Sequence, residues 1–274
     1  MSYRINTNTS ALFANVYGNQ INREIGKSEE RLSTGLRINR ASDDAAGMAI
    51  ANQLRSQSQG LLQANRNASD AIGLVQIADS AMNEYQKILV TARDKAVQAA
   101  SDTNSDDARA ALEEDVKQLL QQADDIAKQT QYNGISLLDG TFTDKKFHVG
   151  SEAGQVITMT IENTDIASQG IDDASIDLTT QSGADAAITS LDTAIKNIDK
   201  IRGAIGSTQN ALESRVRVNE ETQVNVASAE STIRDADYAA ETEALNRNNI
   251  RAQANAFALS KSFEQQQLVL NFLR

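Results

Sequence analysis

Residues that could carry chemistry are few in this sequence. His148 is the only histidine and cysteine is absent, so neither a His/Cys metal centre nor a thiolate nucleophile can form. His148 lies in a stretch with strand-like alternation, where a structural or surface role is expected. No glycine-rich phosphate loop, HExxH or GxSxG motif occurs. We therefore predict no enzyme activity, no cofactor and no metal.

One acidic cluster needs a separate explanation. Asp235, Asp237, Glu241 and Glu243 could suggest a cation site, but their spacing matches no calcium-binding loop. Carboxylates near a helix start interact favourably with the helix dipole, so we interpret the cluster as the start of a helix. We interpret two pairs of neighbouring acids as solvated helix residues: Asp106–Asp107 and Asp124–Asp125.

Composition favours long helices. The 274 residues contain no proline, cysteine or tryptophan, and the net charge is −11. Proline breaks helix interiors, and a strongly acidic surface repels nucleic acid and anionic membranes, so neither is an expected partner. No apolar run reaches the length of a membrane span, and the first residues lack the apolar core of a signal peptide. A cytosolic protein fits, and so does export without a cleaved signal peptide.

Apolar residues recur every seven positions in two parts of the chain. The first series is Leu54, Leu61, Ala68, Val75, Met82, Leu89 and Ala96, and the second is Leu191, Ile198, Ile205, Leu212, Asn219, Val226 and Ile233. Such spacing predicts long helices over 45–100 and 185–234 that pack along their length on other helices. Asn219, the polar member, is either a surface turn of the stripe or a residue that fixes the register.

Shorter elements complete the pattern. Residues 1–40 form a polar arm entering a helix, and a joint lies at 32–47. A helix over 108–130 returns antiparallel to the first long one. After a second joint at Asp235 and Asp237, a last helix runs over 238–274 to an apolar end, which needs a partner to cover it.

Between the long helices the period changes. Asn133-Gly134 and Asp139-Gly140 are hairpin signals, and alternation follows at Phe147, Val149, Ile157, Met159 and Ile161. The predicted fold class is mainly α: a long antiparallel coiled-coil or helix-bundle rod with a small β-hairpin region at 131–185.

Four segments together resemble the bacterial flagellins: MSYRINTNTSALFA, LSTGLRINRASDDAAGMAIANQLRSQ, TQYNGISLLDG and ALSKSFEQQQLVLNFLR. The resemblance covers both ends and most of the helical body. The short middle is similar to a flagellin reduced to its core, and residues 82–100 and 135–150 look closer to the ε-proteobacterial branch than to the enterobacterial one.

The resemblance implies an extracellular subunit that self-associates into the helical flagellar filament. Such a subunit is exported unfolded through a type III channel and folds at the tip. Residues 1–44 and 235–274 would form an inner-core helical pair, disordered in the free monomer, and 45–234 the outer core. Other partners would be hook-associated junction and cap proteins, and an export chaperone on the C-terminal helix. The implied assembly residues are Leu32, Leu36, Asn39, Phe257, Leu268, Leu270 and Leu273.

Many flagellins are also recognised by an animal Toll-like receptor, through a segment reading roughly LQRVRELAVQ. The matching segment here is 89–98, and the implied contact residues are Leu89, Thr91, Arg93, Asp94, Lys95, Gln98 and Asp115. Thr91 replaces an arginine and Lys95 an apolar residue. Each change should cost affinity, so we expect weak or no recognition.

Two alternatives remain. A hook–filament junction protein shares the terminal helices, and a signalling coiled coil would need membrane spans or a signalling tip, neither of which the sequence shows.

Overall fold

The computed structural model describes residues 7–171 and 176–272, with side chains through Leu268. The chain divides into two compact units, Met1–Ser56 with Asn225–Arg274, and Gln57–Val224. The boundaries between these units fall inside two long helices. The division expected at 44/45 and 234/235, where the helices are interrupted, concerns the assembled filament and stays a prediction.

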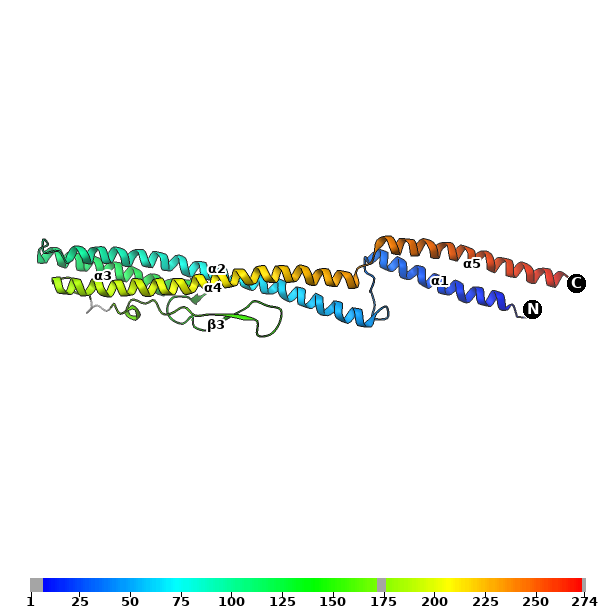
Figure 1. Cartoon of the computed structure of the whole chain (residues 1–274), viewed down its shortest axis with the longest axis horizontal. Coiled ribbons are helices and arrows are strands. Elements are labelled where there is room, and N and C mark those ends of the chain that lie inside the picture. Colours follow the sequence, from blue (N-terminus) through cyan, green and yellow to red (C-terminus); the bar gives the residue numbers. More distant parts are fainter. Residues whose placement is uncertain (1–6, 172–175, 273–274) are drawn as a thin grey trace. The chain divides into compact units, whose positions relative to one another are not determined.

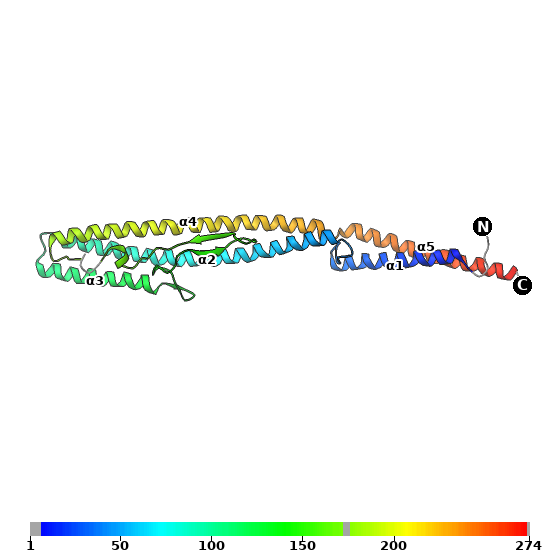
Figure 2. The same cartoon turned by 90° about the horizontal axis from the view of Figure 1, so that it is seen from below.

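The first unit pairs the two ends of the chain. Helices α1 (Thr9–Thr34) and α5 (Tyr238–Phe272) lie side by side and antiparallel (Figures 1 and 2). α1 begins after Asn8, whose Oδ1 accepts the Ala11 N–H at 3.0 Å, and ends at Gly35 with φ of 71°. Only a residue that tolerates positive φ ends a helix in this way. Asp237 caps α5, which confirms the interpretation of this acid as part of a helix start.

Three helices form most of the second unit: α2 (Ala45–Ala99), α3 (Asp106–Gln129) and α4 (Gln181–Arg234). Within this unit the heptad positions from Leu61 to Ala96, and from Leu191 to Asn219, are buried. The predicted long helices and the mainly α fold class are confirmed. α4 begins four residues before the expected position.

Polar contacts between α2 and α4 repeat with the same spacing as the apolar core. Three α2 residues that lie seven apart each contact an acid or arginine on α4. The contacts are Arg93–Asp192, Gln86–Asp199 at 2.8 Å and Asp79–Arg202 at 2.9 Å, and Arg202 also donates to Gln86 Oε1 at 2.7 Å. We call this set the polar ladder. Its members face each other in one antiparallel register only.

The turn between α2 and α3 is held by one arginine. Arg109 Nε donates to the Ala99 carbonyl at 3.1 Å, and Nη2 donates to Ser101 at 3.3 Å. The Ala99 carbonyl belongs to the last turn of α2, where carbonyls lack helical partners, so Arg109 satisfies it. The Ser101 carbonyl lies in the turn and also accepts the Asn104 N–H. Asp106 and Asp107 lie in the first turn of α3 as expected. Asp124 differs from the prediction of a solvated acid, since its side chain is 15% exposed and pairs with Lys128.

Two small antiparallel hairpins follow α3. β1 (Gln131–Tyr132) pairs with β2 (Ile135–Ser136), and β3 (Lys145–His148) pairs with β4 (Val156–Met159). A short 3-10 turn, η1 (Ala167–Gln169), comes after them. Asn133-Gly134 makes the first turn as predicted. Asp139-Gly140 makes no hairpin, because the Asp139 carboxylate accepts the N–H and hydroxyl of Thr141 and closes a local turn instead.

Two asparagines anchor the second hairpin to the helices. Asn67 of α2 donates to the His148 carbonyl at 3.1 Å, and Asn219 of α4 donates to the Val149 carbonyl at 2.9 Å. Asn219 is buried. It is therefore no surface residue, and its hydrogen-bond partner lies at the end of the second hairpin rather than on a facing helix.

Candidate assembly surface and receptor-like segment

Small and polar side chains make up most of the fully buried residues between α1 and α5. Ala11, Ile21 and Ser28 of α1 are buried there, as is Asn248 of α5. At Gly18 a Cβ would lie 2.6 Å from Asn255 Nδ2, so a glycine permits the close approach of the helices.

Hydrogen bonds and ion pairs fix the direction of this helix pair. Asn8 donates to the Ser262 carbonyl at 3.1 Å, and Asn255 donates to the Ala14 carbonyl at 3.0 Å. Ion pairs join the helices at two further levels: Glu24–Arg251 at 3.5 Å and Arg31–Glu241 at 3.5 Å. Partner numbers fall along α5 as they rise along α1, so the antiparallel register is specified over most of the pair.

The two joints of the first unit lie together. Leu36 and Asp235 form an isolated antiparallel bridge. The Arg37 N–H donates to the Arg234 carbonyl at 2.7 Å, and the Ala236 N–H donates to the Gly35 carbonyl at 2.9 Å. Asp43 accepts the N–H groups of Asn39 and Arg40. The hydrogen bond from the Arg40 amide lowers the pKa of the Asp43 carboxyl, against the opposing effect of desolvation.

Large apolar side chains face away from the α1–α5 seam. On α1 they are Leu12, Phe13, Val16 and Tyr17, and on α5 they are Tyr238, Ile250, Phe257, Phe263 and Leu268. We call these the outward apolar face. Phe13 is 64% exposed and Phe257 is 66% exposed. A face of this kind marks an interaction surface.

The expected assembly residues divide into groups. Phe257 and Leu268 belong to the outward apolar face, whereas Leu32 and Leu36 are already half-buried within their own chain. Asn39 donates to the Leu36 carbonyl at 3.0 Å and so has a role within the joint. The side chains of Leu270 and Leu273 lie outside the described residues.

Four α1 residues of this face were absent from the sequence-based set. The signal was present in the run ALFANVY, residues 11–17, because apolar residues at 12, 13, 16 and 17 share one side of a helix. The interpretation of residues 1–40 as a polar arm overlooked this apolar side of the helix.

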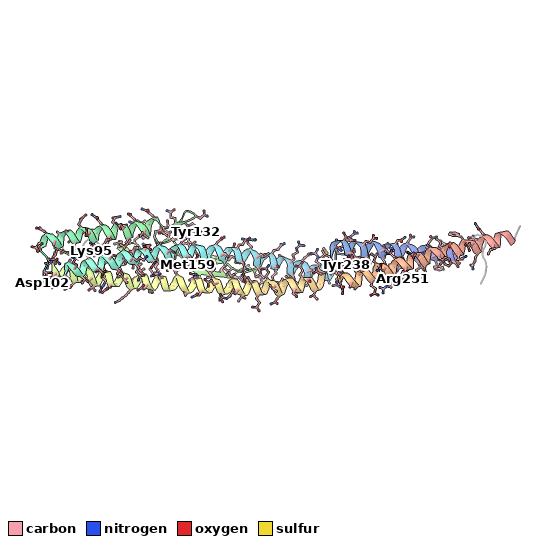
Figure 3. The ribbon with its side chains drawn as sticks, turned by 90° about the horizontal axis from the view of Figure 1, so that it is seen from above. Lys95, Asp102, Tyr132, Met159, Tyr238 and Arg251 are labelled. Atoms are coloured by element: carbon pink, nitrogen blue, oxygen red, sulfur yellow. The ribbon has the colours of Figure 1, made fainter. Side chains whose placement is uncertain are left out.

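The receptor-like segment lies on α2. Leu89 is fully buried in the helical core, so its side chain is no contact residue in this structure. Arg93 is paired with Asp192, and this hydrogen bond raises the arginine pKa and lowers that of the carboxyl. Lys95 pairs with Asp115 at 2.7 Å; Figure 3 labels Lys95 on this part of the bundle. Sequence reasoning missed Asp192, which comes from α4.

The remaining predicted contacts stay at the surface. Thr91, Asp94 and Gln98 are exposed, and the Thr91 hydroxyl donates to the Lys87 carbonyl at 2.9 Å, within its own helix. Within the part of the chain that the structure describes, none of these three side chains forms a hydrogen bond or ion pair with another helix.

Within the described residues, no group of three acidic or histidine side chains is arranged to hold a metal ion. No helix there is long and apolar enough to cross a bilayer. The only histidine, His148, is exposed, and its Nδ1 lies 3.1 Å from the Gln155 carbonyl across the second hairpin.

Two family models match the chain. The bacterial flagellin N-terminal helical region matches residues 5–143, and the C-terminal helical region matches residues 188–273. The chain belongs to the bacterial flagellins. As a member of this family it is a structural subunit of the flagellar filament, which forms by self-association of many copies outside the cell. The outward apolar face is consistent with such a polymer.

Relatives match along most of this flagellin. It is 38% identical to a flagellin of Halalkalibacterium halodurans, covering 90% of this chain and 91% of that one. It is 34% identical to flagellin FlaB1 of Treponema pallidum, over 98% and 99%. Flagellin B of Helicobacter pylori is 51% identical over 60% of this chain, but the match spans only 32% of that longer protein.

Solved structures agree with the fold. The crystal structure of Bacillus cereus flagellin is similar with a TM-score of 0.50 and 31% identity, covering 56% of this chain and 88% of that one. A putative flagellar hook-associated protein from Vibrio parahaemolyticus gives a TM-score of 0.60 over 70% of this chain and all of that one. Its identity is 16%, so this second likeness shows a shared fold alone.

Proposed function

We propose that the α1–α5 pair is the inner core of the filament, in which neighbouring copies cover the outward apolar face. The observation that carries this proposal is the exposure of nine large apolar residues on two helices that bury only one large apolar residue, Ile21, to the same degree as the core. Residues 1–44 and 235–274 would surround the central channel of the filament, and residues 45–234 would form its outer core.

Energetics support ordering upon assembly. Burying one large apolar side chain contributes roughly 1.5–3 kcal/mol, and the seam buries few such side chains. The helix pair alone therefore has little hydrophobic stabilisation, whereas contacts with other copies would add several such contributions. In free subunits the pair would be disordered and would become ordered on polymerisation. The contacts do not close on themselves, so an open helical polymer results.

Export and its partners follow as part of the same proposal. A chain without proline or cysteine folds without slow prolyl isomerisation or disulfide formation, which suits passage in an unfolded state and rapid folding at the tip. An export chaperone would bind the C-terminal helix through the α5 part of the outward apolar face. Junction and cap proteins would contact the ends of the polymer, and no cleaved signal peptide would be needed.

The outward apolar face can be tested with matched substitutions on one helix. Phe13→Ser removes an exposed ring, whereas Asn15→Ser changes an exposed polar residue nearby. Loss of about 2 kcal/mol of burial per contact corresponds to a roughly 30-fold higher critical concentration. We expect this increase for Phe13→Ser and little change for Asn15→Ser, measured by sedimentation after seeded polymerisation. Equal critical concentrations for both variants would contradict the proposal.

A truncation tests the last turns of α5. Removal of residues 265–274 should abolish filaments while the second unit keeps its helical circular dichroism and thermal transition. Continued assembly of the shortened chain would show that the end of α5 is not required. Unseeded full-length protein that forms only short oligomers would instead favour a junction protein.

We also propose weak or absent recognition by the Toll-like receptor. Arg93 and Lys95 are engaged by Asp192 and Asp115, so a receptor would have to compete with existing ion pairs, and Thr91 offers no guanidinium. A reporter-cell assay should give a much weaker response than an enterobacterial flagellin. Thr91→Arg with Lys95→Leu should increase it, and a full response from the unchanged chain would overturn this proposal.

A further inference from the structure

The first hairpin turn contains a chemically labile pair. Asn133 and Gly134 join β1 to β2, with φ of 50° and 76°, and both are exposed. Among the described residues no hydrogen bond or ion pair is recorded for the Asn133 carboxamide. A Cβ built on Gly134 would meet nothing within 4 Å. The side chain and the following amide are therefore both unobstructed.

Such a pair can react without a catalyst. The Gly134 backbone nitrogen attacks the Asn133 side-chain carbonyl carbon, a C–N bond forms, and the side-chain amine leaves as ammonia with the amide proton. Water then adds to either carbonyl of the resulting five-membered imide. One product is aspartate, and the other is isoaspartate, whose chain continues through the former side chain. No oxidant, reductant or cofactor is required.

We propose that Asn133 is a site of spontaneous deamidation in the folded chain. The attack requires the turn to leave its left-handed conformation, so the cost of opening the hairpin sets the rate. β1 and β2 contain two residues each, and an isolated two-stranded hairpin is marginally stable. Figure 3 labels Tyr132, which precedes the turn, at the end of the α3 ribbon.

A second asparagine provides an internal comparison. Asn104 also precedes a small residue, Ser105, and lies in the turn between α2 and α3. Its Nδ2 donates to the Gln98 carbonyl at 2.6 Å, so its carboxamide is held away from the following amide. Asn133 has no such restraint.

The reaction would change the surface and the backbone. Either product adds a negative charge to an acidic chain, and isoaspartate adds a methylene to the main chain inside a two-residue turn. The Gln131–Ser136 and Tyr132–Ile135 pairings could then not both persist. Leu137 and Leu138, fully buried just beyond β2, limit how far the change can spread. Older subunits would thus differ from new ones at this turn.

The experiment uses the full folded chain, incubated at neutral pH and sampled over weeks. Peptide mass spectrometry follows the amide-to-acid mass change at each asparagine, and isoaspartyl methyltransferase labelling detects the rearranged product. Asn-Gly is intrinsically more reactive than Asn-Ser because glycine leaves the following amide unhindered, so the ratio of the two rates in urea serves as the reference. We expect the ratio of conversion at Asn133 to that at Asn104 to be roughly tenfold larger in the folded chain than in urea, the factor that a restraining hydrogen bond represents. Asn133→Gln should remove the signal, because the longer side chain does not form the five-membered ring readily.

A parallel sample unfolded in urea gives the reactivity without structure. If Asn133 reacts in urea but keeps its amide in the folded chain, the turn protects it and the proposal is wrong. Folded-state conversion no faster than at Asn104, or a signal that persists in the Asn133→Gln chain, would also overturn it.

Discussion

The two asparagines that anchor the second hairpin allow a matched test of buried hydrogen bonding. Asn219 and Asn67 both lie in long helices and donate to the neighbouring carbonyls of Val149 and His148. Asn219 is 4% exposed and Val149 is fully buried, whereas the Asn67 bond lies at the surface. Replacing either asparagine by alanine gains the same small helix propensity. The difference between the two variants in free energy of unfolding therefore reports the effect of burying the hydrogen bond.

The magnitude follows from what each substitution leaves behind. Asn219→Ala leaves the Val149 carbonyl buried without this partner, which costs about 1–3 kcal/mol. Asn67→Ala leaves a carbonyl that water can reach, so its cost is below about 0.5 kcal/mol. We expect the two free energies of unfolding to differ by about 2 kcal/mol, or about 4–8 °C in the melting temperature of the second unit.

Calorimetry of the full chain should resolve this difference, with the Asn67→Ala chain as the control. The transition of the second unit must be followed, since that of the first unit should not move. If the free energies of unfolding of the two variants differ by less than about 0.5 kcal/mol, burial does not determine the strength of the Asn219 hydrogen bond.

Three further predictions concern single contacts. Tyr85 is fully buried, burial raises the pKa of its hydroxyl, and that hydroxyl has no hydrogen-bond partner among the described residues; Tyr85→Phe should therefore raise stability by about 1 kcal/mol in urea unfolding, and a loss of that size would contradict this. The pKa of Asp192 is lowered by Arg93, so its contribution is complete above the ordinary aspartate range near ~3.9 and is lost as the pH falls through the lower folded value. In acid titrations Asp192→Asn should thus flatten the loss of stability below about pH 4, and an unchanged slope would refute the role of this pair. Gly18→Ala should push Asn255 off the α1 surface and raise the critical concentration for assembly, whereas Gly26→Ala, with open space around its Cβ, should not.

The helices were predictable because their signals are local and repeated. Heptad residues such as Met82 and Ile198 specify buried stripes, and Gly35 and Asp237 mark helix ends by their own chemistry. The outcome at Asp139 was not predictable in this way, because a local carboxylate–threonine turn competes with a hairpin and both use the same residues. Asn219 shows the same limit: its partner is a carbonyl distant in sequence.

The outward apolar face was predicted only in part. Apolar content at the C-terminal end drew attention to Phe257 and Leu268, but Phe13 and Val16 lie among polar residues, so the composition of the segment concealed their common helix face. The burial of Leu89 was hidden for a related reason: a similar segment gives the residue types, whereas the packing of the neighbouring helices decides which side of α2 is accessible.

The polar ladder resolves an ambiguity that a repetitive core creates. Alanine and leucine at every seventh position would pack almost equally well if α2 slid past α4 by two turns. In one direction such a slide would set Asp79 opposite Asp199. In the other it would pair Arg93 with Asp199, but it would leave Asp192 opposite Ala100 and move Arg202 away from Asp79. The charges of the polar ladder thus disfavour the slipped registers that an otherwise uniform apolar interface between α2 and α4 would allow.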